Sequence, residues 1–109
     1  MASESPYRLV SHLKKAISRI KKYTEGFSES DFLNNDLVQD AALRYFQLMW
    51  EISTDLPPDF KKTHSEINWY FLGDLVANYH EIDLHKVWLF RERELPLIET
   101  NVDLILQNS

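Results

Sequence analysis

The sequence predicts an all-α fold, an antiparallel bundle of four main helices joined by short connections. Apolar residues recur at steps of three and four along the 109-residue chain, which is the spacing of one helix face. No segment alternates apolar and polar residues as a half-buried strand would. Only two Gly and four Pro interrupt the pattern. We expect one helical domain over residues 1–109, because this length is typical of a single small domain.

The first helix is predicted to begin at Pro6 and to end before Gly26. Ser5 is a suitable N-cap, and Pro is favoured at the first helical position because its missing N–H would have no partner there. Gly26 suits the left-handed conformation that follows many helices. The expected buried stripe consists of Leu9, Leu13, Ile17, Ile20 and Tyr23.

The second helix is predicted to run from Asp36 to Asp55. It ends before Pro57 and Pro58, because Pro cannot donate a helical hydrogen bond and restricts the residue before it. Apolar residues along this segment again follow helical spacing, so we expect one face to be buried. The residues expected on that face are Leu37, Ala41, Tyr45, Leu48, Met49 and Ile52.

Two connectors flank the second helix. Residues 27–35 are rich in Ser and Asn, which suit caps and turns. Within them, Phe32 and Leu33 are expected to tuck onto the core. Residues 60–68 form the other connector, with room for one helical turn near Asp59. Short connections of this kind favour antiparallel neighbours.

The third helix is predicted from Trp69 to Tyr79, and Asp83 is the expected N-cap of the fourth. The fourth helix continues to the C-terminus, but Pro96 interrupts it. We therefore expect a kink or a break near Glu94. Its apolar stripe is expected to comprise Leu84, Val87, Trp88, Arg91, Leu95, Ile98, Val102 and Ile105.

Charge and composition narrow the class of protein. The net charge of −5 argues against a general nucleic-acid binder, whose domain is usually basic. The chain has no Cys, no basic-then-apolar leader, and no apolar run long enough to cross a bilayer. These features favour a cytoplasmic protein. The N-terminal basic cluster is either a solvated helix face or a contact for RNA or an acidic partner. It consists of Lys14, Lys15, Arg19, Lys21 and Lys22.

Residues 67–88, INWYFLGDLVANYHEIDLHKVW, carry a resemblance to a known family. Trp69, Tyr79 and the step Ile82-Asp83-Leu84 stand where HepT-like proteins of the HEPN superfamily have them. Similar order and spacing extend over nearly the whole chain, through the exit YTEG at residues 23–26, the turn SESDFL at 28–33 and the second predicted helix. The chain thus resembles HepT-like proteins, and this resemblance implies a HEPN-like helical bundle.

The departure from the family pattern lies between Trp69 and Asp83. The family has an Arg-Asn pair and a His in this interval, with roughly four more residues, about one helical turn. One alignment keeps Tyr79 at the family distance from the Asp83 cap and omits the Arg, the Asn and the His. Another reads Asp74 and His80 as a degenerate motif in which Asp replaces the Arg. We prefer the first alignment because of Tyr79.

The resemblance implies a function. HepT-like proteins are homodimeric toxins that cleave RNA without a metal, and a minimal nucleotidyltransferase (MNT) is their antitoxin. Because the Arg and the His are missing, we expect cleavage to be weak or lost, with His80 and Asp74 as the remaining catalytic candidates. Asp74 would repel phosphate. The rival hypotheses are a non-catalytic helical interaction module, docking through an acidic face of the fourth helix, and a nucleotidyltransferase-associated subunit.

The resemblance also assigns roles to three further residues. The antitoxin adds AMP to the family Tyr, which here is Tyr79; the other reading is an aromatic at the edge of the core. Arg44 and Asn78 are the expected groove residues, in contact with RNA or the partner. The four His are scattered, with His80 and His85 five apart, and no Gly-rich phosphate loop is present. We expect neither a metal site nor a cofactor.

Overall fold

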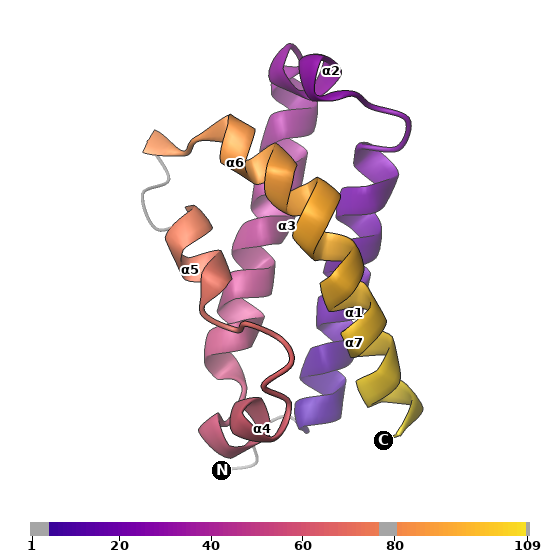
Figure 1. The fold of residues 1–109 in the computed structure, drawn as a ribbon, viewed down its shortest axis with the longest axis vertical. Coiled ribbons are helices and arrows are strands. Elements are labelled where there is room, and N and C mark those ends of the chain that lie inside the picture. Colours follow the sequence, from indigo (N-terminus) through magenta and orange to yellow (C-terminus); the bar gives the residue numbers. More distant parts are fainter. Residues whose placement is uncertain (1–4, 77–80, 109) are drawn as a thin grey trace.

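The computed structural model describes residues 5–76 and 81–108, and over these residues the fold is all-α, as predicted (Figure 1). No strand occurs in either range. One π-helical turn, η2, joins two of the α-helices. The elements are α1 (Pro6–Tyr23), α2 (Glu29–Leu33), α3 (Asp36–Asp55), α4 (Pro58–Thr63), α5 (Phe71–Val76), α6 (Leu84–Leu89), η2 (Phe90–Glu94) and α7 (Leu95–Gln107).

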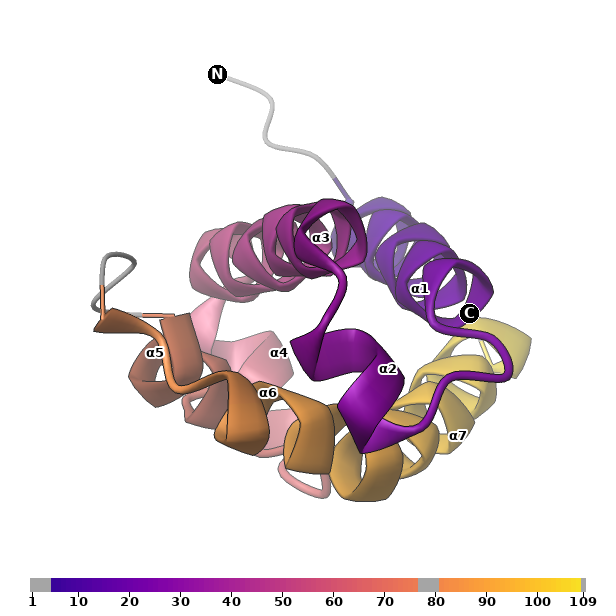
Figure 2. The same cartoon turned by 90° about the horizontal axis from the view of Figure 1, so that it is seen from above.

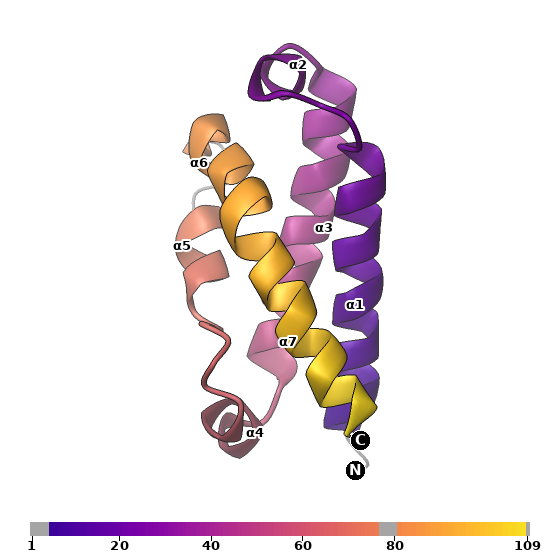
Figure 3. The same cartoon turned by 45° about the vertical axis from the view of Figure 1, so that its right-hand side comes forward.

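The helices form two layers around one core. The long helices α1 and α3 pack side by side in one layer, while α5, α6 and α7 form the other, as the view from above shows (Figure 2). The short helices α2 and α4 lie at opposite ends of the bundle (Figure 3). The α1–α3 layer therefore presents a long outer face, and α5 lies against α3 from the other side.

Capping side chains set the helix starts that the sequence predicted. The Ser5 hydroxyl accepts a hydrogen bond from the Tyr7 amide at 3.3 Å, and Pro6 is the first helical residue. The Asp83 carboxylate accepts from the amides of His85 and Lys86 at the start of α6. These caps satisfy backbone N–H groups that have no partner within the first turn.

The buried face of α1 is the predicted one, whereas the predicted face of α3 is correct for Met49 and Ile52 but wrong for Leu37 and Leu48. Leu37 is 83% exposed and Leu48 is 37% exposed. Apolar residues surround more than half of α3, so periodicity alone cannot choose which stripe faces the core. Packing against α1, α2 and α5 buries the neighbouring stripe instead. Its buried members are Gln39, Ala42, Leu43, Phe46, Met49, Ile52 and Ser53.

Both connectors contain short helices. In the first, the Ser28 hydroxyl and the Asp31 carboxylate form a capping box, and Phe32 is buried as expected. Leu33 is 41% exposed, so it does not tuck onto the core. The second connector contains α4, the helical turn expected near Asp59.

The third predicted helix begins later than expected. Trp69 precedes α5 and is buried in the loop, where its indole N–H donates to the His64 carbonyl at 3.0 Å. This side-chain bond fixes Trp69 without a helical backbone. The predicted end at Tyr79 lies outside the described residues. Among the described residues, α5 is therefore a single short helix from Phe71 to Val76.

The interruption predicted near Glu94 is confirmed as the π-helical turn η2. Pro96 lacks an N–H, so the helix before it must leave carbonyl groups without their usual partners. A π turn accommodates this by widening the coil by one residue. Arg91, expected in the apolar stripe, is half-buried here. Its Nε donates to the Thr24 hydroxyl at 2.7 Å, and its guanidinium lies 5.5 Å from the Trp88 ring centroid.

Ion pairs tie α1 to α7. Lys14 Nζ lies 3.0 Å from Glu99 and 2.9 Å from Asp103, and Lys21 Nζ lies 2.7 Å from Glu99. Burial alone would lower the pKa of Lys14, but its hydrogen bonds to both carboxylates outweigh burial and hold that pKa above 10.5. Burial alone would raise the pKa of Glu99, but the hydrogen bonds from Lys21 and Lys14 outweigh burial and lower that pKa from its ordinary value. The network therefore stays charged across the neutral range.

The N-terminal basic cluster is thus divided between two surfaces. Lys14 and Lys21 face α7 and are paired, whereas Lys15, Arg19 and Lys22 are exposed.

Within the described residues, no helix combines the length and the apolarity that a membrane span requires.

Candidate functional site

The structure places two of the five residues that the sequence singled out. Asp74 is exposed on α5, and Arg44 is exposed on α3. No hydrogen bond or ion pair joins them in the part of the chain that the structure describes. Asn78, Tyr79 and His80 lie outside the described residues, so their roles stay predictions.

Asp74 lies at the edge of a groove between α5 and the α6–η2 segment. The groove has a volume of about 370 Å³. Its lining carries two cations, Lys86 and Arg93, and two carboxylates, Asp74 and Glu94. A smaller hollow next to it is more acidic. This balance of charge gives phosphate no net attraction. The groove is lined by Asp74, Leu75, Lys86, Leu89, Phe90, Arg93 and Glu94.

A close contact with α3 fixes the position of α5. Gly73 faces the Trp50 indole so closely that a Cβ on Gly73 would lie 2.7 Å from Trp50 Cη2. Real Cβ atoms do not approach another heavy atom so closely, so the contact requires glycine at residue 73. The absence of a side chain lets α5 settle onto α3, and this places Asp74 at the groove edge.

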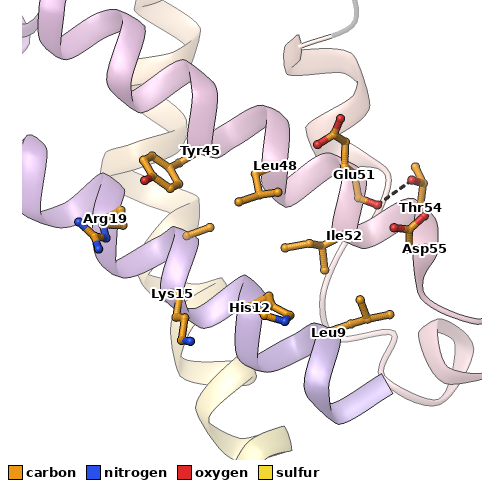
Figure 4. Close-up of a pocket in the computed structure, with 11 residues that line it drawn as sticks. Leu9, His12, Lys15, Arg19, Tyr45, Leu48, Glu51, Ile52, Thr54 and Asp55 are labelled. Atoms are coloured by element: carbon orange, nitrogen blue, oxygen red, sulfur yellow. Dashed lines mark hydrogen bonds between the residues drawn. The ribbon is translucent and has the colours of Figure 1, made fainter. Parts of the chain in front are cut away.

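A second groove, which the sequence analysis missed, runs between α1 and α3 on the outer face of the bundle (Figure 4). Its volume is about 620 Å³. The α1 side carries Lys15 and Arg19, and the α3 side carries Glu51 and Asp55. Tyr45 closes one end, with its ring 5.9 Å from that of Tyr23. The second apolar stripe of α3 was the signal that could have revealed this face.

Two of the four His take part in contacts between or within connecting segments. The His85 ring bonds to the Glu29 carboxylate and so joins the start of α6 to α2. The His64 ring lies 4.5 Å from that of Phe60 and 3.5 Å from a Glu66 oxygen. These contacts give both side chains a structural role. Across residues 5–76 and 81–108, no three His, Cys, Asp or Glu side chains gather as a metal ion would require.

Comparison with known proteins decides the family. The sequence profile described as ribonuclease HepT-like matches residues 13–105. The chain belongs to the HepT-like ribonuclease family. The match extends from α1 into α7, so it includes the lining of the α5–α6 groove and that of the α1–α3 groove except Leu9 and His12. The resemblance seen in the sequence is therefore confirmed, and the helical bundle is the fold of a HepT-like chain.

Three curated relatives carry ribonuclease names. A "Probable ribonuclease HepT" of Thermococcus cleftensis is 28% identical over 80% of this chain and 83% of its own length. A "Putative RNase" of Caldanaerobacter subterraneus is 24% identical over 98% of this chain and 97% of its own length. A "Gamma-glutamylcyclotransferase and putative RNase" of Methanocaldococcus jannaschii is 24% identical over 90% of this chain, which spans only 46% of that longer protein. No solved structure matches the chain significantly.

The close contact at Gly73 predicts that Gly73→Ala destabilises the fold. The added methyl group must displace the Trp50 indole, and overpacking of this kind costs about 1–3 kcal/mol. The free energy of unfolding, measured in urea by the helical circular dichroism signal, should fall by that amount.

The compensating variant is Trp50→Phe, which removes the ring atoms that the methyl group would meet. In the Trp50→Phe background, Gly73→Ala should cost markedly less, so that the two changes are coupled. An equal cost in both backgrounds would show that the Gly73–Trp50 approach does not limit how α5 packs.

Proposed function

We propose that this chain is the toxin-side component of a HEPN/MNT toxin–antitoxin pair, in which the ancestral RNA cleavage is weak or lost. Membership of the HepT-like ribonuclease family supports the RNA-related role. The names of the three relatives agree with it. The family resemblance supplies the toxin–antitoxin arrangement and the MNT-type partner.

One observation carries the proposed loss of cleavage. The exposed ionisable side chain among the described residues of α5 is the Asp74 carboxylate, which the second alignment sets in place of the family Arg. Arg grips phosphate with two parallel hydrogen bonds, and His transfers protons near neutral pH. A carboxylate repels phosphate and is a weak general base at neutral pH. The described part of this interval, residues 69–76, contains neither Arg nor His.

The test of cleavage uses purified chain, single-stranded RNA or tRNA, and a chelator to remove metals. We expect the rate to be at least about 100-fold below that of an active family member, because positioned acid–base groups contribute a factor of that size or more. Gel analysis of the RNA over time measures the cleavage rate.

The control pair for this assay is His80→Ala and His85→Ala. His85 is engaged with Glu29 at the base of α6, whereas His80 is the catalytic candidate of the second alignment. Rapid cleavage that His80→Ala removes and His85→Ala retains would overturn the proposed loss and favour the Asp74/His80 motif.

Tyr79 is the proposed acceptor of AMP from the nucleotidyltransferase partner, on the strength of the family resemblance alone. Modification would add a negatively charged phosphate to this side chain. A second tyrosine nearby in sequence, Tyr70, is exposed and provides a matched control.

Incubation with an MNT-type nucleotidyltransferase and ATP should raise the intact mass of the chain by one AMP. Tyr79→Phe should abolish this gain, and Tyr70→Phe should leave it unchanged. A mass gain that survives Tyr79→Phe would assign the modification to another residue.

The outer α1–α3 face is the proposed homodimer interface. Leu37, Arg44 and Leu48 follow one another at steps of seven and four along α3, so they share its exposed side. Leu37 is too exposed for a residue that contributes to the monomer core. Two exposed Leu side chains on one face of α3 give a second copy apolar surface to cover.

Charge favours a second copy as the partner of this face. The groove has a basic α1 side and an acidic α3 side. A twofold axis lying in the face and parallel to the helices would set α1 of one copy over α3 of the other. The α1 side of each copy, which carries Lys15 and Arg19, would then cover the α3 side of the other, which carries Glu51.

The double change Leu37→Glu with Leu48→Glu should therefore yield a monomer at concentrations where the unmodified chain is a dimer. Both residues are exposed, so the fold should persist. Light scattering after size-exclusion chromatography measures the mass. The matched control places Glu at Leu97 and Leu104, which are exposed on α7. Dissociation by the α7 pair alone would move the interface to α7.

The rival interaction module was expected to dock through an acidic face of the fourth helix. In the structure, Glu99 and Asp103 of α7 pair with lysines of α1, and Glu92 pairs with Arg91. Carboxylates that are already neutralised attract a basic partner less strongly. The ion pairs therefore favour the toxin–antitoxin proposal over this rival.

A further inference from the structure

The corner formed by α4 and the loop that leads to α5 carries a groove of about 660 Å³. We propose that this corner binds single-stranded RNA, with one base stacked on Tyr70 and phosphates held by Lys61 and Lys62. The inference deepens the RNA-related role proposed above and depends on it for the choice of RNA as ligand. The groove is lined by Pro58, Lys61, Lys62, Ser65, Ile67, Asn68, Trp69 and Tyr70.

The charge of this groove distinguishes it from the other hollows. Its lining has two lysines and no carboxylate. The grooves between α1 and α3, between α5 and α6, and beside Lys21 each combine cations with acidic side chains. The nearest acidic residues in sequence are Asp59 and Glu66, which do not line it, and Glu66 lies against the His64 ring. On a chain of net charge −5, this corner is a local site for an anion.

Tyr70 offers the flat apolar surface that a nucleobase requires. Its side chain is 66% exposed, although aromatic side chains are usually buried. The Lys61 ammonium lies over one face of the Tyr70 ring, 5.4 Å from its centroid, so a base would stack on the opposite face with a cation close by. Exposed aromatics next to cations are the usual means of holding single-stranded nucleic acid, because every base has a π-face.

Hydrogen bonds within the chain fix several of the groups that line the groove. Lys61 Nζ donates to the Ser53 carbonyl at 3.0 Å, which anchors this side chain at the end of α3. Trp69 is 4% exposed and its indole is fixed by the His64 carbonyl. The Tyr70 amide donates to the Asn68 side chain at 3.3 Å. A site built from fixed groups loses little entropy on binding.

Single-stranded RNA fits this corner better than a duplex. Stacking on Tyr70 needs an unpaired base, and paired bases do not expose their faces. Two lysines can neutralise only a few phosphates, so a duplex would gain little here while the acidic remainder of the chain repels it.

The experiment is a fluorescence anisotropy titration of the full chain with a labelled single-stranded RNA of mixed sequence. Tyr70→Ala should weaken binding roughly tenfold, the size of one stacked base, and Tyr70→Phe should stay within about twofold. Lys62→Gln should weaken binding at low salt and reduce the slope of log K against log salt by about 0.7. Lys22→Gln, an equal loss of charge at the far end of α1, should have no such effect.

Two competitors identify the ligand. Unlabelled duplex RNA and free AMP should each displace the labelled strand far less well than unlabelled single-stranded RNA. Displacement by AMP at the same concentration would overturn the RNA assignment in favour of a mononucleotide site.

The outcomes separate this site from the proposed function. If the unmodified chain binds RNA and Tyr70→Ala binds it equally well, the corner is not the site, and the RNA-related role stands. If Lys22→Gln weakens binding as much as Lys62→Gln, the contact is diffuse and the site is overturned. If the unmodified chain binds no RNA, the site is overturned, while the pairing with a nucleotidyltransferase is still tested by the AMP mass gain.

Discussion

The contact between Gly73 and Trp50 fixes the position of α5, and the surfaces around α5 depend on that position. The described part of α5 has six residues, Phe71–Val76, and so short a segment is not stable by its own hydrogen bonds. It depends on α3 for its position, and the missing Cβ allows the two helices to meet at the indole. The α5–α6 groove and the exposure of Asp74 both follow from that placement.

Different surfaces of this chain differ in charge, and the net charge of −5 does not reveal these differences. One set of lysines on α1 is neutralised by α7, and another set lines the outer groove opposite the acidic side of α3. The corner near Tyr70 has cations alone. The cations of this chain are therefore unevenly distributed over its surface, and none lies on the described helix α5.

Local sequence rules predicted those parts of the fold that depend on a few neighbouring residues. Ser5 and Asp83 cap helices as expected, α3 has the predicted limits, and Pro96 follows a widened turn.

The predictions that failed concern which residues pack against other helices. Leu37 and Leu48 have the spacing of core residues but face outward, because α3 has two apolar stripes and its neighbours cover the other. Trp69 lies in a loop because a single hydrogen bond to the His64 carbonyl holds it there. Of the candidate site, sequence supplied the residues Asp74 and Arg44, while both grooves arise from helices that are distant in the chain.

The widened turn at Phe90–Glu94 also bears on how such chains tolerate changes of length. A π turn contains one residue more than the regular coil would use over the same rise, and the flanking coils keep their own phase. Trp88 and Leu95 are accordingly both buried although the turn lies between them. A lineage can therefore gain or drop a single residue there without rotating the terminal helix. In such a bundle, insertions and deletions are absorbed by local unwinding, and the core remains aligned.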